Sequence, residues 1–249
     1  MRPLKFVLIV CLFLQQAALA PQPAQAGADP KARALAERVL QQMGGAEGWE
    51  ATRFISWAFI GQYQIWDKQQ QQFRWEKDSL VAVLDIRART GKVYERGQAL
   101  QDEQKVRDLL DHAYAQWTYN SFWLLMPFRL LDKETDLAYA GEGKTQTGAP
   151  ADMLEVTFPE EGAGKYLVWV DKAEGLVTQW AFFSDSTSAT PVFIRRWSDY
   201  GDYGSIKLAA DRSSLQSDLR LHRIAVPAHV PDTIFNSPMP VAKSSKSGF

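Results

Sequence analysis

The residue types that carry most enzyme chemistry are sparse in this chain of 249 residues. It has three histidines and a single cysteine, Cys11, which falls in an apolar segment near the N-terminus. His222 and His229 are seven positions apart, so on a continuous strand they would point to opposite faces and could not share a metal ion. His112 stands beside Asp111 on the polar side of a predicted helix. The histidines therefore predict neither a metal centre nor a catalytic pair.

Carboxylates offer another route to catalysis, and they gather at two places in the chain: Asp132, Glu134 and Asp136, then Glu160 and Glu161. Acids clustered in one loop are typical of a solvated surface, whereas the paired acids of glycosidases come from distant strands. The chain also lacks the HExxH, glycine-rich phosphate-loop and Gly-x-Ser-x-Gly motifs. We expect a protein that is not an enzyme and needs no cofactor or metal. A hydrolase whose acids meet only after folding is the alternative.

Aromatic and apolar side chains are abundant in this chain. The chain has nine tryptophans and thirteen phenylalanines, and residues 120–131 read NSFWLLMPFRLL. Such a stretch forms either plain core or the wall of a pocket for a hydrophobic ligand. The residues that we assign to a hydrophobic cavity or its lid, each of which could equally be core, are Trp57, Phe59, Trp75, Phe122, Trp123, Leu125, Met126 and Phe128.

The first 26 residues have the three parts of a secretory signal peptide: basic MRPLK, apolar FVLIVCLFL and a segment with small residues. We predict cleavage after Ala26 rather than Ala20, because Pro21 follows the latter. The mature chain would then have no cysteine and a net charge of −3, since the removed segment takes two of the 28 basic residues and none of the 29 acids. We therefore expect an exported protein without disulfides, without a transmembrane segment and without affinity for nucleic acid.

Helical patterns occur at two places. Asp29 and Pro30 mark the start of a helix that Gly44 and Gly45 should stop. A central helix is predicted over residues 101–117, with Glu103 paired to Arg107 four residues on. Residues 120–126 would form a short second helix, ended by Pro127.

The other patterned segments predict strands. Residues 53–66 read as one long strand whose odd positions, from Ile55 to Ile65, form an apolar face. In FRWE, Phe73 and Trp75 share one face, and Arg74 and Glu76 share the other. Residues 136–226 contain seven further short strands separated by turn residues, which favours an antiparallel meander. We expect one domain over residues 27–240 and a polar, disordered tail over 241–249.

The predicted fold class is mainly β with α: a curved, unclosed antiparallel barrel with helices on its concave side. The N-terminal helix and the central helical insertion are too few to cover a sheet of about ten strands. A cavity under the central insertion would explain how the apolar face of the sheet is used.

The order of these elements resembles the LolA/LolB-like superfamily of periplasmic lipoprotein carriers, and within it a less characterised LolA-like branch. The resemblance covers most of residues 30–230. It rests on the signal peptide and first helix, the Phe73-Arg74-Trp75-Glu76 segment, DIRARTGKVYERG, the helical Ser121–Leu125 and the late hairpin around VDKAEGLVTQWAFF. It implies a periplasmic, non-catalytic protein with a hydrophobic cavity for the acyl chains of lipoproteins or for other lipids.

One departure from the family concerns the lid. The carriers place a basic residue and a proline before the aromatic-x-Trp segment, where this chain has Gln69–Gln72. Arg53, Arg74 or Arg129 would have to take over that role. We therefore predict a binding or carrier protein for a lipid, lipoprotein acyl chains or another hydrophobic ligand. The alternative is an exported factor of the same fold that fills its own core and acts on envelope proteins.

Overall fold

The structure is a computed structural model that describes residues 29–159 and 164–241. The predicted signal peptide (1–26), residues 242–249 of the predicted tail, and Glu160 and Glu161 lie outside the described residues.

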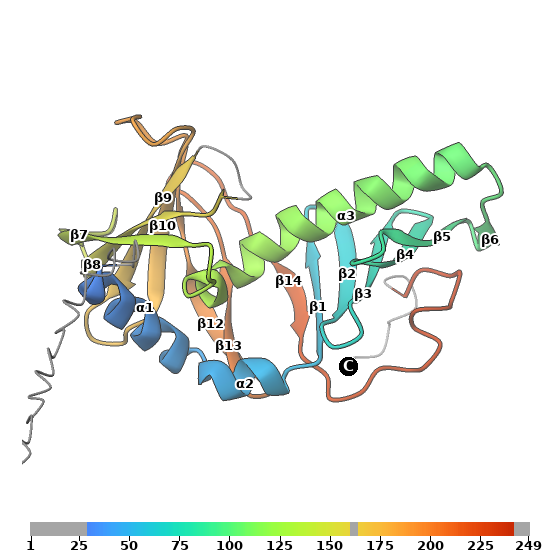
Figure 1. The fold of residues 1–249 in the computed structure, drawn as a ribbon, viewed down its shortest axis with the longest axis horizontal. Helices are drawn as coiled ribbons and strands as arrows, with labels where there is room; N and C mark the ends of the chain where they lie inside the picture. Colours follow the sequence, from blue (N-terminus) through green and yellow to red (C-terminus); the bar gives the residue numbers. More distant parts are fainter. Residues whose placement is uncertain (1–28, 160–163, 242–249) are drawn as a thin grey trace, which may run out of the picture.

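The described strands form two larger antiparallel sheets and a two-stranded ribbon, which lie along the length of the molecule (Figure 1). The seven-stranded sheet has the order β14-β1-β2-β3-β4-β5-β6, with bounds His222–Ala225, Phe54–Phe59, Gln62–Asp67, Gln72–Lys77, Leu80–Asp85, Thr90–Glu95 and Gln98–Ala99. The five-stranded sheet has the order β11-β10-β9-β8-β7, with bounds Phe193–Arg196, Val177–Phe183, Lys165–Asp171, Pro150–Thr157 and Asp136–Lys144. The ribbon pairs β12 (Ser198–Tyr203) with β13 (Ile206–Asp211).

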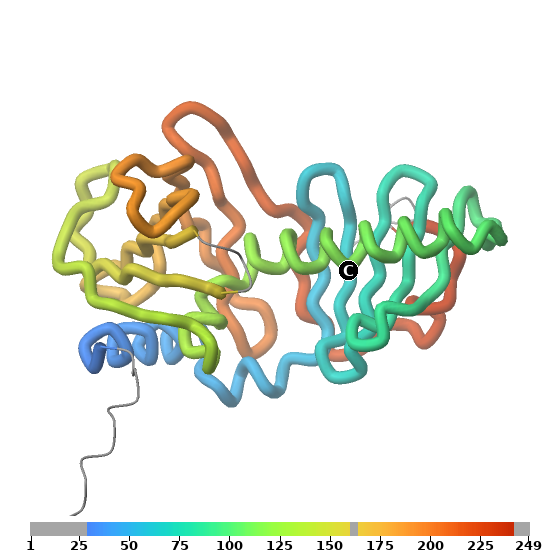
Figure 2. Tube along the Cα trace, turned by 45° about the horizontal axis from the view of Figure 1, so that its top comes forward, coloured from blue at the N-terminus to red at the C-terminus, as the bar shows by residue number. Residues whose placement is uncertain are grey.

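Three α-helices cover these sheets: α1 (Pro30–Gln42), α2 (Gly45–Ala51) and α3 (Glu103–Leu125), which a 3-10 turn, η1 (Met126–Arg129), extends. Helix α3 crosses the seven-stranded sheet, and its C-terminal end reaches the five-stranded sheet (Figure 2). One large cluster of buried apolar residues runs through both parts of the molecule. The prediction of a mainly β fold with unclosed antiparallel sheets and few helices is confirmed.

The prediction of one long strand over residues 53–66 was wrong. Ile60 and Gly61 have φ angles of 49° and 70°, and this pair of left-handed residues closes the two-residue hairpin between β1 and β2. The turn reverses the alternation of faces. Ile55, Trp57 and Phe59 share a face with Gln62, Gln64 and Trp66, because Trp57 lies opposite Gln64 and Phe59 lies opposite Gln62. The predicted apolar partners Tyr63 and Ile65 are on the other face.

The central helical segment also differs from the prediction of two helices. Helix α3 is continuous over 23 residues, from the Asp102 cap to Leu125. Its expected Glu103–Arg107 pair is present at 3.4 Å. The proline does end the α-helix, since Pro127 has no N–H to donate and the chain continues as a 3-10 turn.

The first helix begins as predicted, with the Asp29 carboxylate accepting from the Lys31 N–H at 2.9 Å. The first helix also ends as predicted, at Gln42 just before the two glycines, but a second helix that was not predicted, α2, follows directly. Gly44 has a φ of 113°, and a Cβ built on it would lie 2.2 Å from the Ser205 carbonyl oxygen. A glycine is therefore required where the chain turns between α1 and α2 against the ribbon.

Candidate ligand-binding interior

The eight residues predicted to line a cavity or its lid are all buried, with exposures between 0% for Trp57 and Met126 and 6% for Trp123 and Phe128. They belong to one cluster but form two groups. Trp57, Phe59 and Trp75 lie on the face of the seven-stranded sheet that α3 covers. The other five follow each other at the end of α3 and in η1. The Phe59 and Trp123 rings, 5.7 Å apart, join the two groups.

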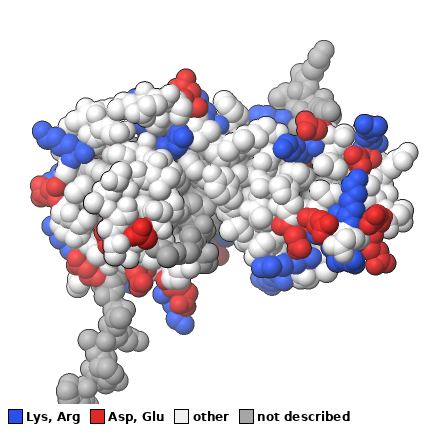
Figure 3. Space-filling view, turned by 90° about the horizontal axis from the view of Figure 1, so that it is seen from above, with Lys and Arg blue, Asp and Glu red and all other residues white. Residues whose placement is uncertain are grey.

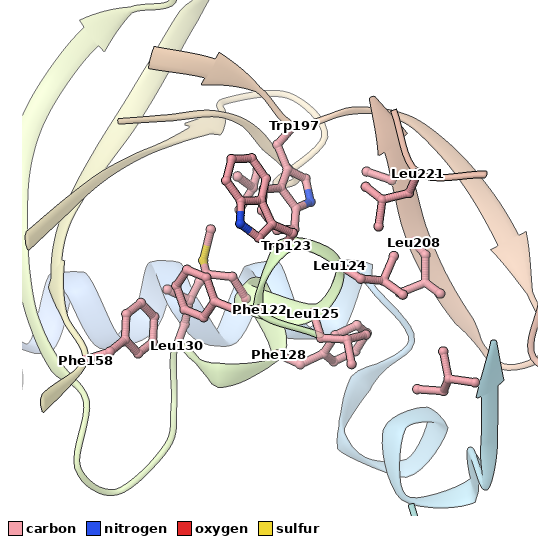
Figure 4. Packing of buried hydrophobic residues seen from close by; sticks show 14 of the residues in the cluster. Phe122, Trp123, Leu124, Leu125, Phe128, Leu130, Phe158, Trp197, Leu208 and Leu221 are labelled. Carbon is pink, nitrogen blue, oxygen red and sulfur yellow. The ribbon is translucent and has the colours of Figure 1, made fainter. Parts of the chain in front are cut away.

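The end of α3 packs aromatic side chains against the five-stranded sheet, and we call Phe122 and Trp123 the aromatic plug. Figure 4 shows Phe122 and Trp123 between Phe158, which follows β8, and Trp197, which stands between β11 and β12. The Trp123 ring centroid lies 4.9 Å from Trp180 and 5.5 Å from Phe193. Phe122 stands edge-on to Phe158 at 5.2 Å. These rings fill the space that a ligand would need, so this half of the interior is packed core in the structure.

A buried arginine fixes this plug. Pro127 is four residues after Trp123, and because it lacks an N–H it leaves the Trp123 carbonyl without the helical donor. The Arg212 Nε donates to that carbonyl at 2.8 Å, and the guanidinium lies 3.4 Å over the Trp197 ring. Burial lowers the pKa of Arg212 to about 9, so it stays charged at neutral pH. A cation here also suits the negative end of the helix dipole.

Of the three arginines considered as a lid latch, Arg129 contacts the end of α3, with its guanidinium 5.8 Å from the Phe122 ring centroid, whereas Arg53 and Arg74 bind elsewhere. Arg53 pairs with Asp67 at 2.9 Å, and Arg129 pairs with Asp132 at 3.1 Å. Arg74 is on the opposite face of the sheet, as the alternation in FRWE predicted. Sequence patterns gave no signal for Arg212, because it follows a strand end and meets α3 only through the tertiary fold.

The other half of the interior, between α3 and the seven-stranded sheet, contains polar groups. Gln62 donates to the Gln116 Oε1 at 2.8 Å and accepts from the Trp75 Nε1 at 2.5 Å and from the Asn120 Nδ2 at 3.2 Å. This network connects α3 to β2 and β3. Gln62, Trp75 and Asn120 are buried and Gln116 is half-buried. Because polar groups in an apolar interior need their partners, these hydrogen bonds favour one position of α3 on the sheet.

Next to this network, several buried polar atoms have no hydrogen-bond partner among the described residues. They are both side-chain amide atoms of Gln64, the indole N–H groups of Trp57, Trp66 and Trp117, and the Asn120 Oδ1. Gln64 is fully buried and lies opposite Trp57 on β1 and Trp75 on β3. The Trp66 and Trp117 rings are in edge contact at 5.7 Å. We call the groups of Gln64, Trp57, Trp66 and Trp117 the polar row. Hydrogen-bond donors predominate in it.

The polar row was not predicted, because the predicted strand over residues 53–66 carried the alternation of β1 through the hairpin turn. With Ile60-Gly61 taken as a two-residue turn, Gln62 and Gln64 would have been placed on the face of Trp57 and Phe59. The Gln–x–Gln spacing was visible, but a β-branched residue at the first turn position disguised the turn.

The helix above the polar row is anchored mainly at one end. Of the first seventeen residues of α3, Leu110 and Ala113 are buried, whereas five of the last six are buried. The N-terminal part lies on β4 and β5 with a surface ion pair between Lys105 and Glu95 at 3.0 Å. Exposed pairs of this kind stabilise little. The long N-terminal part of α3 is thus the element that could move away from the sheet, with the plug as its fixed end.

The described surface shows little sign of catalytic or nucleic-acid chemistry. Asp132, Glu134 and Asp136 are exposed. No group of three His, Cys, Asp or Glu residues in the described chain is placed to hold a metal ion. On the face seen in Figure 3, acidic and basic side chains are mixed and no large basic patch occurs. Within residues 29–159 and 164–241, no helix has both the length and the apolar character needed to cross a membrane.

The fold and interior define an α+β protein with unclosed antiparallel sheets, an apolar interior and a helix laid over it. No protein-family model matches the chain, and no curated protein matches it. Its fold is similar to a LolA superfamily protein from Nitrosomonas europaea, with 12% identity and a TM-score of 0.38 over 83% of this chain and 97% of the other. It is also similar to a DUF1329 family protein from Desulfovibrio piger (12% identity, TM-score 0.39, 82% and 96% covered). A third similar structure is a putative outer membrane lipoprotein-sorting protein domain from Vibrio parahaemolyticus (12% identity, TM-score 0.39, 81% and 97% covered). The LolA superfamily named from the sequence is thus among the structures that the fold resembles.

Proposed function

We propose that this chain is an exported, non-enzymatic binding protein that carries a lipid, lipoprotein acyl chains or another hydrophobic ligand between α3 and the seven-stranded sheet. In this proposal residues 1–26 are a signal peptide, residues 27–240 form one domain, and the mature protein acts in the periplasm. The polar row is the observation that carries the proposal.

The unpaired groups of the polar row lower the stability of the protein. A buried donor or acceptor without a partner costs about 1–3 kcal/mol, so a core selected only for stability would not keep Gln64 beneath α3. A ligand with carbonyl oxygens would pair the indole and amide N–H groups. Its chains would replace the contacts that the sheet now makes with Leu110, Ala113 and Trp117. An ester- or amide-linked acyl lipid has this combination of groups.

The free energy gained on ligand binding is sufficient to lift the N-terminal part of α3 from the sheet. Each buried CH₂ contributes about 0.8 kcal/mol, so an acyl chain of ordinary length contributes on the order of 10 kcal/mol. Lifting the N-terminal part of α3 removes few fully buried side chains of the helix itself from the interior, since the aromatic plug can stay in place, and the ligand then covers the apolar side chains of the sheet. Trp123, Phe122 and their neighbours then act as the fixed end of the lid, and Trp57, Phe59 and Trp75 form the floor.

The experiment uses mature protein purified from the periplasm. Organic extraction and mass spectrometry should identify a co-purifying lipid, and the delipidated protein should take up a fluorescent acyl ester. Gln64→Leu should weaken uptake at least tenfold, whereas Gln104→Leu, the same change on the exposed side of α3, should leave it unchanged. Absence of both extracted lipid and uptake would contradict the proposal.

The second candidate is an envelope interaction or assembly factor with a self-filled core. It is favoured by the complete burial and mutual packing of the eight predicted cavity residues. Such a protein would bind no acyl ester but would co-purify with an envelope protein from cross-linked cells.

A further inference from the structure

The seven-stranded sheet has a second covered face, opposite to α3. We call residues 226–241 the C-terminal arm. The arm leaves β14, crosses this opposite face and lies on the far side of the sheet from α3 (Figure 1, red). It contains no helix or strand, and Ile234 is its one buried residue.

Two buried charged residues of β3 hold the arm. Arg74 is 0% exposed and Glu76 is 3% exposed, and the Arg74 Nε donates to the Glu76 Oε1 at 2.6 Å. The two Nη atoms of Arg74 donate to three carbonyl oxygens of the arm: Ile234 at 2.9 Å, Ser237 at 2.7 Å and Met239 at 2.6 Å. Glu76 in turn accepts from the Val241 N–H at 2.9 Å.

The four hydrogen bonds between the Arg74–Glu76 pair and the arm all involve backbone atoms of the arm. The planar guanidinium presents several N–H groups in a fixed arrangement, and here the arrangement fits a set of main-chain carbonyls rather than a carboxylate. Every residue type supplies a carbonyl, and every type except proline supplies an N–H. The Arg74–Glu76 pair can therefore bind many sequences, provided that the backbone has the right shape.

The arm also covers apolar side chains of this face. Ile65 lies opposite Arg74 and Val81 lies opposite Glu76, and the two are 3% and 0% exposed. A segment that leaves the face would expose them, so another segment must take its place. Pockets lie beside the arm at both ends. One, of about 240 Å³, is lined by Arg53, Phe54 and Asp67 together with arm residues that include Phe235. The other, of about 300 Å³, is lined by Tyr63, Glu76 and Asp78 together with Pro240 of the arm.

We infer that this face is a peptide-binding site that recognises the backbone of a non-helical segment of a partner protein, and that the C-terminal arm occupies it in cis. The partner segment replaces the arm, places its carbonyls on Arg74 and its N–H on Glu76, and extends side chains into the flanking pockets. The site is separate from the interior under α3, and either could exist without the other.

The test measures binding of a fluorescein-labelled peptide with the sequence of residues 230–241 by fluorescence anisotropy. In the full mature chain the arm competes with the peptide, so binding should be weak. Ile234→Asp weakens docking of the arm in cis and should raise the affinity for the labelled peptide at least tenfold. A peptide that keeps isoleucine at position 234 and phenylalanine at position 235 and has alanine at its other non-proline positions should bind within threefold of the original.

Variants of the pair decide whether Arg74 and Glu76 carry the binding. In the Ile234→Asp background, Glu76→Gln and Arg74→Lys should each weaken peptide binding at least tenfold, whereas Glu95→Gln on β5 should not. Equal binding by the wild type and Ile234→Asp would overturn the inference, as would tighter binding that neither pair variant reduces. Light scattering that shows a dimer built by arm exchange would assign the site to a second copy and would also overturn it.

A second variant covers failure of Ile234→Asp to fold. A protease site inserted between Ala228 and His229, both exposed, allows the arm to be cut after the protein has folded. The cut arm should then exchange for the labelled peptide, with the mass of the complex reporting the replacement. An arm that stays bound through a day of incubation with excess peptide would overturn the inference.

Discussion

Replacing Gln64 by leucine should stabilise this protein. Gln64 is fully buried beneath α3, and neither its amide oxygen nor its amide nitrogen has a partner among the described residues. Each unpaired group costs about 1–3 kcal/mol, and leucine of similar size removes both. After allowance for imperfect packing of the branched side chain, we expect a gain of about 2 kcal/mol in the free energy of unfolding. For a chain of this length that gain raises Tm by roughly 4–8 °C.

Gln62→Leu is the matched control, because it makes the same change two residues earlier on the same face of β2. Gln62 bonds to Trp75, Gln116 and Asn120, so its loss leaves three partners with fewer bonds, and two of them, Trp75 and Asn120, are buried. We expect a loss of about 2 kcal/mol and a lower Tm. Thermal unfolding followed by circular dichroism, with urea titration at 25 °C, measures both variants.

The two substitutions should therefore shift Tm in opposite directions. A fall in Tm for Gln64→Leu that matches the fall for Gln62→Leu would refute the reasoning, because Gln64 would then be a satisfied structural residue. A rise in Tm combined with loss of acyl-ester uptake would identify a group kept for binding at a cost in stability.

Four further substitutions test how the fold is held. Gly44→Ala should cost on the order of 3 kcal/mol, from left-handed strain and the close Ser205 carbonyl, whereas Gly61→Ala, with φ of 70° and nothing within 4 Å of the built Cβ, should cost only about 1 kcal/mol in urea unfolding. Arg212→Met should leave the Trp123 carbonyl unpaired, lower stability by about 1–3 kcal/mol and speed hydrogen exchange in the last turn of α3. Burial raises the pKa of Asp211, but hydrogen bonds from Ser213 and Ser198 outweigh it and hold the pKa below 3.8. The stability that this carboxylate adds is therefore present above about pH 4 and is lost as pH falls through the lowered pKa, so the difference between Asp211→Asn and the wild type at pH 7 should shrink as pH falls below 4.

Each of these expectations has a clear contrary result. Equal losses for the two glycine variants would show that the Ser205 carbonyl moves aside freely. Unchanged exchange in the last turn of α3 after Arg212→Met would show that another donor reaches the Trp123 carbonyl. A stability difference for Asp211→Asn that is undiminished at pH 2 would mean that the hydrogen bonds do not depend on the charge.

Local patterns predicted a large part of the fold. The Asp29 cap and the faces of FRWE follow from rules that act over a few residues, and the structure confirms them. The predictions failed at turns and junctions. The Ile60-Gly61 hairpin, the second helix after Gly44 and the continuity of α3 depend on contacts with distant residues, which override weak local signals.

The candidate site shows the same division. The sequence alone predicted a signal peptide, whose removal would leave no cysteine, and showed that the aromatic residues concentrate in segments able to face one interior. Only the tertiary structure decided which polar groups share that interior. The hairpin turn placed Gln64 beneath α3, the packing of two sheets brought Arg212 to the carbonyl that Pro127 leaves unpaired, and β3 brought Arg74 under the C-terminal arm. Periodicity assigns a residue to a face, but the partners across that face come from segments up to 165 positions away and are fixed by packing.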